Sequence, residues 1–242
     1  MTQSILLKLS GEALGGDAGF GIEPAVLEKM CADVAELVAA GVRVAIVLGG
    51  GNIFRGQALA ARGLDRVVGD RMGMLATVMN GLALSDFLGR ADVANSLFSA
   101  LPIPSLVQGY GRDSVRQTMQ DGQVAVLCGG TGNPYFTTDT AACLRGIELG
   151  VDAIVKATNI DGVYDADPRT NPDAKRYTEV TYDEVLAKEL GVMDLTAIVL
   201  CKEQQMPLVV CDVTEAGALV KIAAGEPVGT RVVSSLSSAP TA

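Results

Sequence analysis

The stretch VAVLCGGTGNPYFTTDTAACLRGIELG, residues 124–150, joins a pattern typical of a buried strand to a pattern typical of a helix. Residues 124–128 form a short, continuous apolar run, as expected of a strand that is covered on both faces of a sheet. From residue 138 the apolar positions recur at helical spacing, and Gly150 is a typical helix stop. The glycines and hydroxyl side chains between them stand where a helix presents its first free N–H groups, which attract negative charge. Two interpretations follow: an anion-binding loop, or an ordinary turn in which a threonine caps the helix.

Two earlier segments repeat the pattern of an apolar run followed by glycines. Residues 4–9 form one such run and lead to a glycine-rich segment at 15–21, and residues 42–48 form another, which ends in three glycines at 49–51. The intervening residues 24–41 have apolar positions at helical spacing behind a proline, which helices tolerate at their first position. Ligands of parallel sheets bind beyond the carboxyl ends of the strands, so we expect the glycine segments to gather there.

Lys8 stands near the end of the first apolar run. An ammonium group in a buried strand costs free energy to desolvate unless it is paired. Two partners are open at this point, a buried carboxylate or a ligand phosphate.

The three glycines at 49–51 belong to neither of the familiar nucleotide-binding motifs, the Gly-x-x-x-x-Gly-Lys-Ser/Thr loop or Gly-x-Gly-x-x-Gly. Consecutive glycines can still bring backbone N–H groups against phosphate oxygens, and Arg55 can add a forked cation. The alternative is a flexible turn with a surface arginine.

The rest of the chain continues to alternate between helix and strand patterns. Asp70 stands near the start of one expected helix, where a carboxylate is favoured as a cap. We expect helices at 70–82, 113–120, from 138, from 181, from 194 and at 216–224, and strands at 101–107, 151–158, 208–211 and 230–233. This order predicts an α/β fold, with a central, mostly parallel sheet between two helical layers. We expect one domain over 1–233 and a disordered tail over 234–242.

Composition restricts the function. The net charge of -9 argues against a nucleic-acid or membrane-surface partner, which would require a basic face. The five cysteines are widely spaced in apolar surroundings, so we expect buried thiols and a reducing cytoplasm. Histidine is absent, which removes Ser-His and Cys-His nucleophile pairs. Any chemistry must use Lys, Arg, carboxylates, backbone dipoles or a metal held by oxygen.

Together, six motifs resemble those of the bacterial uridylate kinases, which belong to the amino acid kinase superfamily. They run in order over the chain to about residue 233: KLSGE at 8–12, GGGN at 49–52 with Arg55, GDRMGM at 69–74, TGNPYFTTD at 131–139, KAT at 156–158, and DGVY at 161–164 with Ala-Asp-Pro at 166–168. Each motif is weak alone, whereas the set is specific.

The resemblance implies an amino acid kinase-like three-layer sandwich and transfer of the ATP γ-phosphate to UMP, giving UDP, in pyrimidine nucleotide biosynthesis. It also implies Mg²⁺, held mainly by the nucleotide phosphates, and an allosteric homohexamer in the cytoplasm. Residues 1–150 would form the acceptor-binding half and residues 151–233 the ATP-binding half.

The resemblance also implies roles for individual residues. The catalytic residues would be Lys8, Asp139 and Arg55, with Asp139 orienting Lys8. ATP would be bound by Lys8, Leu9, Ser10, Gly11, Gly51, Arg55, Thr158, Tyr164 and Asp167. UMP would be bound by Gly50, Asp70, Thr131, Gly132, Asn133, Pro134, Tyr135, Phe136, Thr137 and Thr138.

One segment departs from the family pattern. Relatives are commonly activated by GTP, and basic side chains after Gly81 take part, whereas residues 85–92 carry a single cation, Arg90. This departure argues against GTP activation, although the glycine-rich loop at 16–21 that is associated with it is present. Two other functions stay open: a kinase of the same fold that acts on carbamate, glutamate or aspartate, and a nucleotide sensor without turnover.

Overall fold

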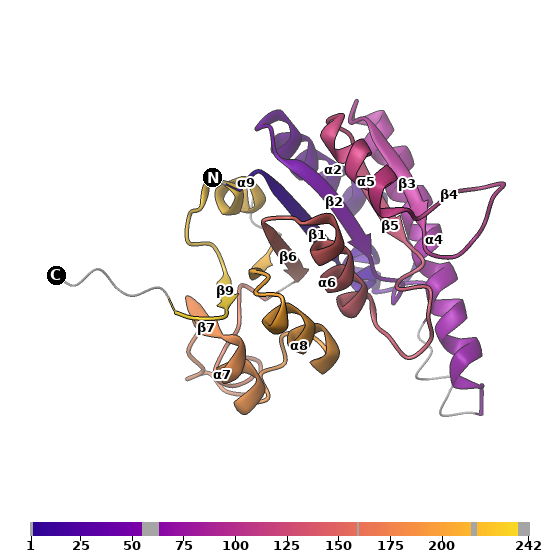
Figure 1. The fold of residues 1–242 in the computed structure, drawn as a ribbon. Helices are drawn as coiled ribbons and strands as arrows, with labels where there is room; N and C mark the ends of the chain where they lie inside the picture. The colour runs from indigo at the N-terminus through magenta and orange to yellow at the C-terminus, as the bar shows by residue number, and fades with distance from the viewer. Residues whose placement is uncertain (1, 55–62, 159, 214–216, 237–242) are drawn as a thin grey trace.

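In a computed structural model, which describes residues 2–54, 63–158, 160–213 and 217–236, nine strands form one sheet in the order β4-β3-β5-β2-β1-β6-β8-β9-β7 (Figure 1). The strands are β1 Ser4–Leu9, β2 Arg43–Leu48, β3 Asn95–Ser99, β4 Gln108–Gly109, β5 Val124–Cys128, β6 Ala153–Thr158, β7 Glu179–Thr181, β8 Leu208–Asp212 and β9 Thr230–Val233. Neighbouring strands are parallel except β8 and β9, which are antiparallel. The predicted α/β fold with a mostly parallel sheet is confirmed.

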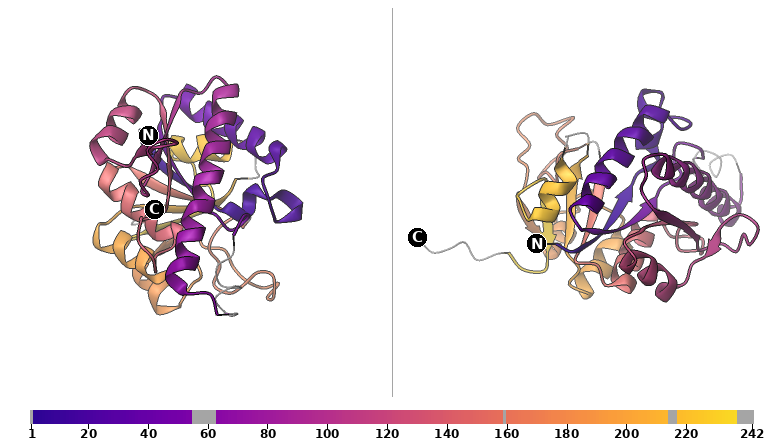
Figure 2. Two further views of the ribbon diagram at one scale, coloured as in Figure 1. Left: turned by 90° about the vertical axis from the view of Figure 1, so that its right-hand side faces the viewer. Right: turned by 90° about the horizontal axis from the view of Figure 1, so that it is seen from above.

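Helices cover both faces of this sheet (Figures 1 and 2). The described helices are α1 Gly11–Leu14, the 3-10 turn η1 Gly16–Ala18, α2 Pro24–Ala39, α4 Arg66–Arg90, α5 Arg112–Gln120, α6 Thr138–Leu149, α7 Tyr182–Ala187, α8 Leu195–Glu203 and α9 Ala218–Ala224. Side chains of α2, α4 and α9 share one buried cluster, and those of α5, α6, α7 and α8 share another. The sheet therefore lies between two hydrophobic layers, as predicted.

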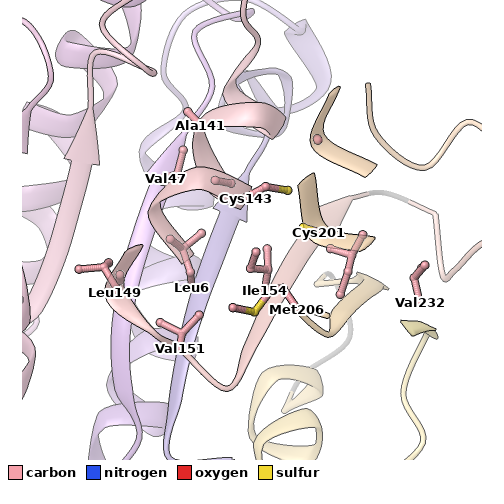
Figure 3. Close-up of a cluster of buried hydrophobic side chains, with 14 of the residues drawn as sticks. Leu6, Val47, Ala141, Cys143, Leu149, Val151, Ile154, Cys201, Met206 and Val232 are labelled. Carbon is pink, nitrogen blue, oxygen red and sulfur yellow. The ribbon is translucent and has the colours of Figure 1, made fainter. Parts of the chain in front are cut away.

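The alternation of side chains along β1 decides where Lys8 points. Ile5, Leu7 and Leu9 pack into the α2 layer, whereas Leu6 packs into the α6 layer. Figure 3 shows Leu6 with Ile154 of β6 and Cys143 of α6 in that layer. Because successive side chains of a strand point to opposite faces, Lys8 lies on the α6 side with Leu6.

The cysteines follow the prediction. All five are free thiols and are buried: Cys31, Cys128, Cys143, Cys201 and Cys211. Burial raises the pKa of the Cys31 thiol to about 11, as expected of structural rather than reactive cysteines.

Two predictions about elements are wrong. Residues 101–107 are turns, and the strands there are β3 before them and β4 after them. Pro102 and Pro104 lack the N–H groups that a ladder needs. The sequence of β3 has two apolar residues, Leu97 and Phe98, between polar ones, so it contains no long apolar run. Asp70 is not a cap either, because α4 begins at Arg66 and Asp65 accepts from the Val68 N–H at 3.1 Å.

The helix α4, with 25 residues, is the longest of the described helices. It has the length and mean hydropathy, 1.2, of a membrane span, but 44% of that window is buried inside the molecule. Its inner side packs on β3 and β5. Its outer side exposes an apolar stripe, which we call the α4 stripe, formed by Val68, Met72, Leu75 and Met79.

Candidate active site

Two lysines converge on one carboxylate at the carboxyl ends of the central strands. Lys8 on β1 and Lys156 on β6 are partners in the parallel register, so their side chains leave the same face side by side. Asp139, in the first turn of α6, faces them with Oδ1 2.7 Å from Lys8 Nζ and Oδ2 2.8 Å from Lys156 Nζ. The buried carboxylate partner that the sequence left open for Lys8 is therefore Asp139.

This cluster has an excess of positive charge. Burial alone would raise the pKa of the Asp139 carboxyl, but the charges of Lys8 and Lys156 and their hydrogen bonds outweigh it and hold the pKa below its ordinary value. Two ammonium groups share one carboxylate, so one positive charge is left for an anionic ligand. Lys156 is also held by the Val192 carbonyl, to which it donates a hydrogen bond.

The glycine loop at 49–51 is pressed between two helices. A Cβ added at Gly11, the first residue of α1, would lie 2.6 Å from the Gly51 nitrogen. A Cβ at Gly50 would lie 2.8 Å from the Gly73 carbonyl oxygen of α4. Only glycine allows this approach, so the loop is packed rather than a free turn. Arg55, the predicted cation of this loop, lies outside the described residues.

A first cavity of about 380 Å³ lies between this loop, α4 and the loop that precedes α6. Among its lining residues are the predicted UMP residues Gly50, Asp70, Thr131, Asn133, Phe136, Thr137 and Thr138. Gly51, predicted to bind ATP, lines it as well. Gly132, Pro134 and Tyr135 are not among the lining residues, although they lie in the same loop.

Asp70 links α4 to that loop. Its carboxylate accepts two hydrogen bonds from Arg66 Nε, at 2.8 and 2.9 Å, and one from the Tyr135 N–H at 2.7 Å. Tyr135 has a φ of 70°, which is uncommon for a residue other than glycine. Asp70, which lines the first cavity, therefore holds a strained backbone position in the loop that precedes α6.

The opening of α6 combines the two interpretations of its sequence. Thr137 caps the helix by accepting from the N–H groups of Asp139 and Thr140. Its own hydroxyl donates to Asp194, the cap of α8, which also accepts from the Thr140 hydroxyl. The threonine is thus an ordinary cap that also lines the first cavity.

The predicted ATP residues are divided between two further cavities. Thr158, Tyr164 and Asp167 line a cavity of about 470 Å³. Lys8, Leu9, Ser10 and Thr158 line another of about 660 Å³ toward α2 and α9. Lys156 and Thr158 line both, so the two cavities meet at the end of β6.

The sequence reasoning missed two side chains of this site. Lys156 belongs to the KAT motif at 156–158, but its register with Lys8 shows only in the folded sheet. Arg66 is the cationic side chain among the described lining residues of the first cavity. Its position four residues before Asp70 in a helical pattern was the available signal.

Comparison with known proteins agrees with this geometry. The model of the amino acid kinase family matches residues 3–212. A uridylate kinase of Alcanivorax borkumensis is 56% identical over 228 residues, which cover 94% of this chain and 90% of the relative.

This chain belongs to the amino acid kinase family. A uridylate kinase of Legionella pneumophila is 57% identical over 94% of this chain and 92% of its own length. The crystal structure of UMP kinase from Bacillus anthracis has a TM-score of 0.94 at 33% identity, with 97% of both chains covered. The residues that the family model matches, 3–212, include those that line the first two cavities and those of the lysine cluster.

A metal would have few ligands from this family member's own side chains. Among the described residues, no group of three or more Asp, Glu, Cys or His side chains could hold an ion. Both oxygens of Asp139 already face lysines. The donor set fits Mg²⁺ that is coordinated chiefly by nucleotide phosphates.

Proposed function

We propose that this protein is a UMP kinase that transfers the γ-phosphate of ATP to UMP and releases UDP and ADP. The observation that carries the proposal is the Lys8–Asp139–Lys156 cluster. Thr138, next to Asp139, lines the first cavity, and Lys156 lines the second. Positive charge thus lies between a pocket for an acceptor and a pocket for a donor.

Phosphoryl transfer suits a chain without histidine. An oxygen of the UMP phosphate attacks the γ-phosphorus, a P–O bond forms, and the bond to the β-phosphate oxygen breaks as ADP leaves. The attacking oxygen is already anionic at neutral pH, so catalysis needs positioning and fixed charge more than proton transfer. Lys8 and Lys156 stabilise the charge on the equatorial oxygens, and Asp139 keeps both ammonium groups in place.

The loops supply the positions of the two nucleotides. We propose that Gly51 and Gly11 hold the triphosphate, with Arg55, Leu9 and Ser10. Thr158, Tyr164 and Asp167 would hold the adenosine. The first cavity would hold UMP, with Gly50, Asp70 and residues 131–138 around it. UMP and the triphosphate would then lie mainly against the half 1–150, and the adenosine of ATP against the half 151–233.

Magnesium would enter with ATP. When bound, Mg²⁺ neutralises phosphate charge, and the phosphates themselves supply most of its ligands. Asp139 is the carboxylate of the lysine cluster, and its contacts with Lys8 and Lys156 make electrostatic positioning its main task.

The whole molecule is proposed to be a homohexamer that works in the cytoplasm. The α4 stripe supports association, because contiguous exposed apolar surface marks interaction sites. The five free, buried thiols support a reducing compartment.

The segment 85–92 bears on activation by GTP. Arg90 pairs with Asp86 at 2.5 Å and lies over Phe87, so the single cation of this segment is already engaged. A measurement of rate against GTP concentration tests the allosteric response.

The experiment is an acceptor panel. ADP release from ATP would be measured with UMP, CMP, carbamate, glutamate and aspartate at equal concentrations. We expect turnover with UMP to exceed turnover with every other acceptor. Faster turnover with one of the three small acceptors would assign the chain to another kinase of this fold, and binding of ATP and UMP without ADP release would make it a sensor.

A further inference from the structure

The buried side of α4 carries two polar residues that face the two substrate loops. Asn80 is 0% exposed and Thr77 is 2% exposed. They lie about one turn apart on the helix. Helix positions that pack on a sheet are normally apolar, so two buried polar side chains need partners.

Asn80 forms a closed pair with Asn52, which is also 0% exposed. Asn80 Nδ2 donates to Asn52 Oδ1 at 2.7 Å, and Asn52 Nδ2 donates to Asn80 Oδ1 at 3.0 Å. The second donor of Asn80 reaches the Gly49 carbonyl at 2.8 Å, and that of Asn52 reaches the Gly21 carbonyl at 2.7 Å. Every N–H of the two amides is therefore used.

This pair ties the first glycine of the loop at 49–51 to α4. Gly49 follows β2 directly, and its N–H donates to the Leu9 carbonyl at 2.8 Å. The Asn80 contact fixes the carbonyl of the same residue, which belongs to the next peptide group. A buried amide that loses its partner costs the full desolvation of the group, so the pair holds one geometry.

Thr77 performs the same task for the other loop. Its hydroxyl donates to the Met74 carbonyl of the preceding turn at 2.7 Å. That bond directs its lone pairs outward, where the oxygen accepts from the Gly129 N–H at 2.7 Å. Gly129 opens the loop to α6 with a φ of 78°, so Thr77 anchors the loop where the chain turns.

We propose that Asn80 and Thr77 are positioning residues that act on different substrates. Asn80, with Asn52, sets the glycine loop at 49–51 against the ATP phosphates, and Thr77 sets the loop at 129–138 against UMP. The inference rests on the proposed UMP kinase activity. Neither side chain takes part in the chemistry. Asn80 acts through the Gly49 carbonyl, and Thr77, which also lines the first cavity, acts through the Gly129 N–H.

The test compares the two Michaelis constants in single variants. Loss of one positioning hydrogen bond corresponds to roughly a tenfold change. Thr77→Val should raise KM for UMP about 10-fold and change KM for ATP less than about 2-fold. Asn80→Ala should raise KM for ATP about 10-fold and KM for UMP less than about 3-fold, because Gly50 stays packed on Gly73.

The control is Leu88→Val, which removes buried volume from the same helix two turns further on. It should lower the melting temperature and leave the ratio of the two KM values unchanged. Asn52→Ala and the double variant Asn52→Ala/Asn80→Ala should match Asn80→Ala, since residues that act as a pair are not additive. Should Asn80→Ala fail to fold, Asn80→Ser leaves room for a bridging water and takes its place.

The ratio of the KM values decides the outcome. The proposal is supported if the ratio of KM for UMP to KM for ATP rises in Thr77→Val and falls in Asn80→Ala. Equal shifts of both constants in both variants, or no shift in either, overturn it. Failure of the proposed function would appear separately, as a wild-type protein that releases no ADP with UMP.

Discussion

At the scale of single residues, Asp139 has the most demanding environment. Its side chain is 14% exposed, and it faces two ammonium groups that belong to neighbouring strands. Without it, Lys8 and Lys156 would repel each other at the end of the sheet, and both would keep a hydration shell that a phosphate must displace. Asp139 therefore allows Lys8 and Lys156 to lie side by side, where they form a binding site for an anion.

Removing either ammonium group should slow the chemical step. We expect Lys8→Ala and Lys156→Ala each to lower kcat roughly 10²- to 10³-fold, as expected for loss of one donor to a charged transition state. Lys202→Ala is the control, because that lysine pairs with Asp183 at the surface. Steady-state kinetics with both substrates saturating make the measurement, and a near-normal kcat in Lys8→Ala would remove Lys8 from the mechanism.

Asp139 should also make the free energy of unfolding depend on pH in the acid range. The pKa of Asp139 is lowered in the folded protein from 3.8, so the stabilisation is complete above that value and disappears as pH falls through the lower folded pKa. The difference in unfolding free energy between wild type and Asp139→Asn should be largest near neutral pH and shrink in acid. Urea unfolding at a series of pH values measures it, and a difference that grows in acid would contradict the ion-pair description.

At the scale of elements, the start of α6 depends on the start of α8. Asp194 caps α8 through the Ala197 N–H at 3.1 Å and holds the Thr137 and Thr140 hydroxyls. Because Asp139 stands in the first turn of α6, its aim at the lysines depends on this junction. The junction joins the loop of the first cavity to the segment whose Val192 carbonyl holds Lys156.

A cap that serves two helices should affect both stability and rate. Asp194→Ala should lower the free energy of unfolding by about 2 kcal/mol, from a lost cap and an unsatisfied buried hydroxyl. It should also lower kcat. Thr181→Ala is matched, because Thr181 caps α7 through the Glu184 N–H alone. The Thr181→Ala variant should lose about 1 kcal/mol of unfolding free energy and keep its kcat. If kcat falls equally in Thr181→Ala and Asp194→Ala, the loss of rate follows the loss of stability and Asp194 has no role in positioning Asp139.

At the scale of the whole molecule, α4 serves two surfaces at once. Its inner side packs on the sheet and contacts both substrate loops. Its outer side carries the α4 stripe, where Leu75 and Met79 are 49% and 55% exposed. A second copy of the chain is the partner that the proposed hexamer supplies for this surface.

A charge placed in the α4 stripe should break that association. Leu75→Asp should elute with a lower mass than wild type in light scattering, because a carboxylate in an apolar interface costs free energy to desolvate. Phe20→Asp, at an exposed apolar position outside α4, should keep the wild-type mass. An unchanged mass in Leu75→Asp would place the subunit contact elsewhere.

Local patterns were enough to predict much of the fold. The apolar runs at 4–9 and 124–128, the helix stop at Gly150 and the helix from about residue 181 depend on neighbours in sequence, and each is found in the structure. The order of strands and helices then predicted a parallel sheet, and with it the edge where ligands bind.

The tertiary structure alone decided which groups meet. The register of β1 and β6 brings Lys8 beside Lys156, and α4 brings Asn80 to Gly49 and Thr77 to Gly129. Periodicity reports which face a residue occupies, but not which distant segment covers that face. Hydrogen bonds and ion pairs act over a few ångströms, so these contacts exist only after the sheet order and the helix packing are set.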